Sequence, residues 1–216
     1  MIHYRKIAAS IGAVTLLSGM PYVTAAEQEA SVQEFAATGT APSILSYSYE
    51  SPAYGYHVMC PKRPLGVIPA STLFENREGE VLIFENEEYH IKYAWVVLVN
   101  AFPEEALPNL NAIDPEEAAR LLWNIMGSNG YEGIMLVPLT DNNKAIFAMT
   151  AKEIEIDEDG DGVIDGTATT DNQMAVLFFR GDNGARYGFE LIDNPELRAA
   201  SVSDFLAGAR TLHALP

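Results

Sequence analysis

The chain has 216 residues, 48% of them hydrophobic and 20% charged, and its formal net charge at pH 7 is −17. A protein this acidic repels nucleic acid and anionic membrane surfaces, so neither is an expected partner. The length is sufficient for one domain with a sizeable core, and the composition gives no sign of a second.

The first 26 residues have the features of a secretory signal peptide. Arg5 and Lys6 form a short basic start, residues 7–17 are apolar and uncharged, and small residues end at Ala26. An apolar stretch this short does not span a bilayer, although an uncleaved anchor is the alternative. We expect a secreted or periplasmic mature protein with no membrane span.

The mature chain is expected to begin with a flexible arm. Residues 27–43 are rich in Ala, Glu, Gln and Thr and show little apolar periodicity. A single α+β domain is predicted over residues 44–216.

Cys60 is the one cysteine of the sequence, which excludes an internal disulfide. His57 is close to it, so a catalytic thiol with a histidine base is one interpretation. Residues three apart on an extended segment point to opposite faces, however, and the pattern favours a buried, inert thiol. An intermolecular disulfide is the remaining alternative.

Alternating and apolar stretches predict an antiparallel sheet of about six to eight strands. The clearest candidates form three pairs, each joined by a short polar turn: residues 81–85 with 89–99, residues 134–139 with 144–149, and residues 173–180 with 185–192. Arg180-Gly181-Asp182 spells an integrin-recognition tripeptide, but the last turn would use the same residues in any case.

Two helices are predicted, one central and one C-terminal. Asp114 is an N-cap candidate followed by Pro115, with Glu117 as the capping-box partner, and an apolar stripe follows. Ser201 opens the second predicted helix, and its apolar side carries Val202, Phe205, Leu206 and Ala209.

The acidic stretch between the second and third strand pairs has the pattern of a calcium-binding loop. Four aspartates stand at ligand positions 1, 3, 5 and 9 of this pattern: Asp157, Asp159, Asp161 and Asp165. Gly162 occupies position 6, where the backbone must bend, and Val163 at position 7 would supply a carbonyl oxygen. Seven carboxylates between residues 153 and 165 repel one another, which a cation would relieve. The alternative is a solvated acidic turn, because Asp and Gly are also common turn residues.

This segment resembles the Asp-x-Asp-x-Asp-Gly calcium loops of EF-hand-like type. Position 12 is Ala168 instead of a bidentate Glu. The two helices of an EF-hand are not expected either, because residues 152–156 before the loop alternate like a strand and residues 166–170 after it are a poor helix start. The closer resemblance is to thrombospondin type 3 and integrin-type loops, in which an Asp at position 9 ligates directly. That resemblance implies a bound metal and does not imply an activity. Because position 12 lacks the Glu, we expect a structural Ca²⁺ with the Kd of extracellular modules, about 10⁻⁴ to 10⁻³ M.

Two functions of different class follow from these observations. The first, which we favour, is an exported, non-enzymatic structural or interaction module stabilised by calcium. The second is an exported hydrolase that uses the calcium loop only as scaffold, although the sequence contains no nucleophile-elbow, zinc-protease or phosphate-loop motif. His57, His90 and His213 are the histidines of the mature chain, and none lies in a metal-ligand spacing. No motif identifies a protein or glycan partner.

Overall fold

The computed structural model describes residues 45–88, 90–126, 131–150, 153–156, 166–169, 174–181, 183–193 and 198–216. The expected signal peptide, the arm over residues 27–43 and the acidic segment 157–165 lie outside these ranges. So do Gly127 and Gly130, which follow the central helix.

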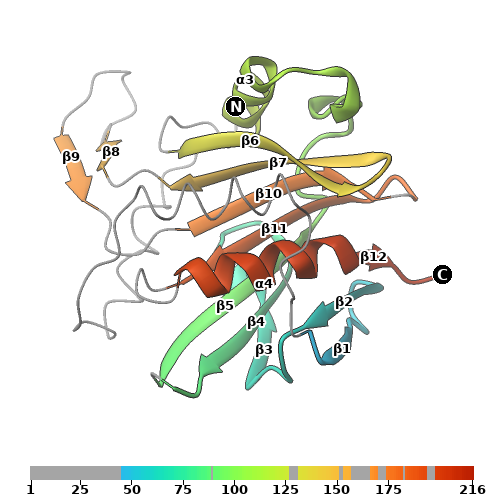
Figure 1. The fold of residues 1–216 in the computed structure, drawn as a ribbon, viewed down its shortest axis with the longest axis vertical. Helices are drawn as coiled ribbons and strands as arrows, with labels where there is room; N and C mark the ends of the chain where they lie inside the picture. The colour runs from blue at the N-terminus through green and yellow to red at the C-terminus, as the bar shows by residue number, and fades with distance from the viewer. Residues whose placement is uncertain are drawn as a thin grey trace.

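A seven-stranded antiparallel sheet forms the centre of the fold (Figure 1). In spatial order its strands are β3 (Gly66–Pro69), β4 (Glu78–Asn86), β5 (Ile91–Val99), β11 (Arg186–Ile192), β10 (Met174–Arg180), β7 (Asn143–Thr150) and β6 (Tyr131–Thr140). The three predicted pairs are present as β4 with β5, β6 with β7 and β10 with β11. β3 pairs with β4, and β11 joins the early strands to the later ones through β5. The sheet and two long helices confirm the predicted α+β class.

Each face of this sheet is covered by one of the two helices. Helix α3 (Pro115–Met126) lies on one face next to β6, and its Ala118, Leu121 and Leu122 belong to the same buried core as Val176 and Phe178 of β10. Helix α4 (Arg198–Thr211) crosses the other face, where Val202, Phe205 and Leu206 join a second core (Figure 1). The domain therefore has three layers, with the sheet buried on both sides.

Two small sheets complete the described fold. One contains β1 (Tyr47–Glu50), β2 (Tyr56–Cys60) and β12 (His213–Ala214), and it lies beside α4. The other contains only β8 (Glu153–Ile156) and β9 (Gly166–Thr169), which flank the acidic segment.

Helix α3 begins as its sequence predicts. The backbone N–H of Glu117 donates to Asp114 Oδ1 at 2.8 Å, which is the expected N-cap bond. The Glu117 carboxylate does not complete a capping box, because it accepts from Arg120 Nη2 at 3.0 Å instead.

Helix α4 begins three residues before its predicted start, at Arg198, so Ser201 lies inside the helix. The predicted apolar side is correct, since Val202, Phe205, Leu206 and Ala209 are all buried. At Gly208 the helix approaches the sheet closely: a Cβ there would lie 2.6 Å from Trp95 Cζ3. The absence of a side chain at this position lets α4 close over a fully buried tryptophan.

Candidate functional site

The ends of the predicted calcium loop are brought together by strand pairing. β8 and β9 are antiparallel, with Ile156 directly opposite Gly166. The strand predicted before the acidic segment is present as β8, and it pairs with β9, a strand that the sequence did not predict. The acidic segment therefore connects paired positions. The predicted ligands themselves, Asp157, Asp159, Asp161, Val163 and Asp165, lie outside the described residues.

Elsewhere in the described ranges, no group of three or more His, Cys, Asp or Glu side chains is arranged to hold a metal ion. Within the same residues, no helix is long and apolar enough to cross a membrane.

Cys60 is a buried thiol, as the sequence favours. Its side chain is fully enclosed, and its Sγ donates only a weak bond to the Val58 carbonyl at 3.9 Å. Burial raises the pKa of the Cys60 thiol to about 12, so it stays protonated near neutral pH. A protonated thiol is a poor nucleophile, which argues against a catalytic cysteine.

His57 interacts with Ser48 and His213 instead of Cys60. Ser48 Oγ and His57 Nε2 are 2.9 Å apart, and the rings of His57 and His213 lie 4.7 Å apart between centroids. His57 Nδ1 is buried and has no hydrogen-bond partner in the described structure. His213 lies in β12, two residues after the end of α4, and pairs with His57 across the small sheet.

The large sheet buries one carboxyl group near each face. Glu80 of β4 is 8% exposed, and its Oε2 accepts from Tyr56 Oη at 2.7 Å and from Tyr49 Oη at 3.0 Å. Burial first, and then Glu80, raises the pKa of both tyrosines, so both hydroxyls remain donors. This contact joins the small sheet to β4.

Glu190 of β11 has a different environment. Its neighbours Phe189 and Leu191 belong to the core between the sheet and α4. Because successive side chains of a strand point to opposite faces, the Glu190 side chain points towards the α3 side of the sheet. It is 3% exposed, and its Oε2 is buried with no partner in the described structure. Burial raises the pKa of Glu190 to about 7, and the nearby charge of Arg77 opposes that rise.

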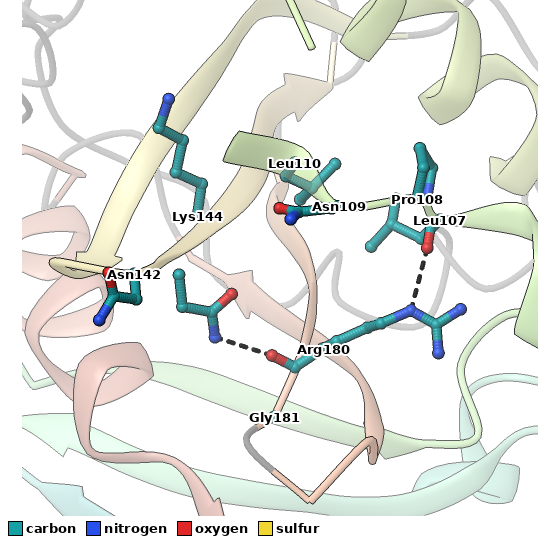
Figure 2. Close-up of a pocket in the computed structure, with 9 residues that line it drawn as sticks. Leu107, Pro108, Asn109, Leu110, Asn142, Lys144, Arg180 and Gly181 are labelled. Carbon is teal, nitrogen blue, oxygen red and sulfur yellow. Dashed lines mark hydrogen bonds between the residues drawn. The ribbon is translucent and has the colours of Figure 1, made fainter. Parts of the chain in front are cut away.

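A pocket of about 470 Å³ opens where three chain segments meet at one end of the sheet (Figure 2). The segments are the loop before α3, the turn between β6 and β7, and the end of β10. The lining residues are Leu107, Pro108, Asn109, Leu110, Asn142, Asn143, Lys144, Arg180 and Gly181.

Hydrogen bonds fasten the three walls of the pocket to one another. Arg180 Nε donates to the Leu107 carbonyl at 2.9 Å, and Asn143 Nδ2 donates to the Arg180 carbonyl at 2.7 Å (Figure 2). Arg180 Nη2 also donates to the Glu104 carbonyl, and Asn111 Nδ2 donates to the Asn142 carbonyl at 2.7 Å. The Arg180 guanidinium is thus already hydrogen-bonded to the backbone of this protein, which disfavours recognition of Arg180-Gly181-Asp182 by an integrin.

Sequence reasoning missed this pocket and the burial of Glu80 and Glu190. The pocket residues come from three separate segments, 107–110, 142–144 and 180–181, and form no local motif. The signal that was available for Arg180 is its place at the end of a predicted strand, where a long polar side chain can reach across to a neighbouring loop.

No family model matches the chain, and no curated protein matches it. Among solved structures, the solution structure of cyanobacterial PsbP (CyanoP) from Synechocystis sp. PCC 6803 is similar over 81% of this chain and 96% of that chain, with 12% sequence identity and a TM-score of 0.47. Similarity at this level carries no functional assignment.

Proposed function

We propose that this chain is an exported, non-enzymatic calcium-binding module in which Ca²⁺ stabilises the connection between β8 and β9. The observation that carries the proposal is the register of this hairpin, with Ile156 opposite Gly166. Because the strands pair up to those residues, the intervening segment with its four aspartates must start and end at one place. A closed segment of this kind suits ligands that converge on a cation.

The hairpin also needs stabilisation from another source. β8 and β9 pair with each other and with no other strand in the described part of the chain. An isolated two-stranded hairpin is marginally stable in water, and neighbouring carboxylates about 4 Å apart repel by about 1 kcal/mol. A bound Ca²⁺ would remove the repulsion and hold the two strands together, with side-chain oxygens from Asp157, Asp159, Asp161 and Asp165 and the carbonyl of Val163.

An exported hydrolase is the second candidate, and one contact favours it. The 2.9 Å distance between Ser48 Oγ and His57 Nε2 is that of a nucleophile and its base. Such a base is normally oriented by a third group on its other nitrogen. His57 Nδ1 has no such partner among the described residues, so the non-enzymatic function is the better supported of the two.

Thermal unfolding with and without calcium tests the proposal. For a Kd of about 10⁻⁴ to 10⁻³ M, about 10 mM calcium adds about 1.5 to 3 kcal/mol to the free energy of unfolding. That raises Tm by several degrees relative to chelator. Asp159→Ala should abolish the shift, because it removes a central ligand.

Asp141→Ala is the matched control, since Asp141 is an exposed aspartate in the turn between β6 and β7. This variant should retain the full calcium shift. Identical melting curves with calcium and with chelator would remove calcium from the function of this protein, and so would an unchanged shift in Asp159→Ala.

A further inference from the structure

The pocket at the end of β10 has the charge of an anion site in a strongly acidic protein. The whole chain contains 30 Asp and Glu residues against 13 Lys and Arg. None of the nine residues that line the pocket is acidic, and two of them, Lys144 and Arg180, are cationic. The side chains that line the pocket therefore carry positive charge, while the exposed acidic residues Asp141 and Glu104 lie next to Asn142 and Arg180 outside the lining.

The two cations have different roles. Arg180 is held by two backbone carbonyls and lies 5.8 Å from the centroid of the Phe102 ring, so it fixes the wall and contributes a stationary charge. Lys144 has no hydrogen bond or ion pair with any described residue. Figure 2 shows its side chain extending from β7 away from Arg180, at the far rim of the pocket. Its ammonium is therefore available to a ligand.

Three asparagine side chains supply the hydrogen-bonding groups of the pocket. Asn109 Oδ1 accepts from the Asn111 backbone, which leaves its NH₂ group as a donor. Asn143 uses its NH₂ group on the Arg180 carbonyl, which leaves its Oδ1 as an acceptor. Asn142 keeps both groups on an exposed turn. Mixed amide donors and acceptors match hydroxyl groups, each of which both donates and accepts.

The remaining wall is apolar. Pro108 is exposed at the pocket, and Leu107 and Leu110 are buried beneath it. A wall of this kind suits the C–H face of a sugar ring. A volume of about 470 Å³ falls within the range of about 300 to 1,000 Å³ that is usual for small-molecule sites.

We propose that this pocket binds a small polyhydroxylated carboxylate, a sugar acid of mono- or disaccharide size. Its carboxylate pairs with the Lys144 ammonium, and its hydroxyl groups bond to the amides of Asn109, Asn142 and Asn143. The pocket is built before the ligand arrives, because Arg180, Asn143 and Asn111 already fasten its walls together. The proposal is independent of calcium binding, since none of these residues belongs to the acidic segment.

Calorimetric titration of residues 27–216 with galacturonate, in calcium-containing buffer, tests this site. We expect saturable binding of galacturonate, and binding of neutral galactose that is about tenfold weaker because it lacks the charge. Lys144→Gln should lower the affinity for galacturonate by about tenfold, to the level of galactose. Asn142→Ala should weaken both sugars.

Lys92→Gln is the matched control. Lys92 is exposed at the start of β5, a strand that contributes no residue to the pocket, and its loss changes the net charge equally. It should leave the affinity for galacturonate unchanged, which separates a pocket contact from the field of the whole protein. The proposal is overturned if galacturonate gives no saturable binding, if galactose binds equally well, or if the Lys144 and Lys92 variants behave alike. If galacturonate bound only through calcium, the Lys144 and Lys92 variants would have the same affinity for it, and the proposal would be overturned.

Discussion

Each face of the central sheet buries a glutamate carboxyl group, and the two groups differ in their hydrogen-bond partners. On the α4 side, Glu80 receives two hydrogen bonds from Tyr49 and Tyr56. On the α3 side, Glu190 lies among apolar side chains with one oxygen unpartnered in the described structure. The strands that carry these residues are both well paired, so the difference comes from what covers the sheet.

This contrast shows what determines the consequence of burying a charge. A carboxylate is costly to bury because it loses its water, and donors such as phenol hydroxyls replace part of that solvation. Glu80 has these donors because β1 and β2 pack against the sheet there and supply two tyrosines. Glu190 Oε2 has no donor in the described structure, and burial raises the pKa of Glu190 although the charge of Arg77 opposes the rise.

The largest effect is expected from removing the partnered carboxylate. Glu80→Ala leaves the hydroxyl of fully buried Tyr56 without its acceptor and opens a cavity. It also removes the hydrogen bonds between β4 and the small sheet. Together these changes should lower the free energy of unfolding by about 4 kcal/mol. Tm should then fall by about 10 °C for a domain of this size.

Glu88→Ala provides the reference for this measurement, because Glu88 is an exposed residue in the turn after β4. It should change the stability by less than about 0.5 kcal/mol. If both variants unfold at the same temperature, the tyrosine contacts of Glu80 do not stabilise the fold.

The second prediction concerns pH and Glu190. Its pKa of about 7 in the folded protein lies above its ordinary value of 4.5, so the folded state binds the proton more tightly. Stability contributed by this group is therefore fully present below about pH 4.5 and is lost as pH rises through about 7. The loss is on the order of 3 kcal/mol, and Glu190→Gln should not show it.

Chemical denaturation at about pH 4.5 and about pH 8, with chelator present, measures this difference. The quantity compared is the free energy of unfolding of Glu190→Gln minus that of the wild-type protein. This difference should be larger at the higher pH than at the lower pH by about 3 kcal/mol. Glu88→Gln should show no such change. A constant difference between Glu190→Gln and wild type at both pH values would mean that Glu190 does not titrate in this range.

Much of the framework was predictable because it depends on local pattern. Period-two alternation and short polar turns located the three strand pairs, and Asp114 with Pro115 located the start of α3. The start of α4 was harder to predict. Ser201 is a good N-cap residue, but Ala199 and Ala200 before it have high helix propensity, and the helix extends through them.

The buried acids and the pocket could not be predicted from the sequence for a physical reason. Phe189, Glu190 and Leu191 alternate as if Glu190 faced solvent, and only the layer formed by α3 and its preceding loop covers that face. The pocket depends on the same long-range packing, because Leu107, Asn142 and Arg180 meet only after the sheet has formed. The predicted calcium ligands remain a prediction, supported by the pairing of β8 with β9.

The smallest effects are expected from removing single donors of Glu80. Tyr56→Phe removes the shorter, fully buried bond and should cost about 2 kcal/mol. Tyr49→Phe should cost about 1 kcal/mol or less, because Tyr49 is only half-buried and water can approach the vacated position.

The double variant gives the sharper result. Both hydroxyls donate to the same oxygen, Glu80 Oε2, so either tyrosine alone still solvates the buried charge in part. Removing both leaves the buried carboxylate without either of these donors. The combined loss should therefore exceed the sum of the single losses by about 1 kcal/mol. Strict additivity would show that the tyrosines stabilise the interface between the sheets independently of one another.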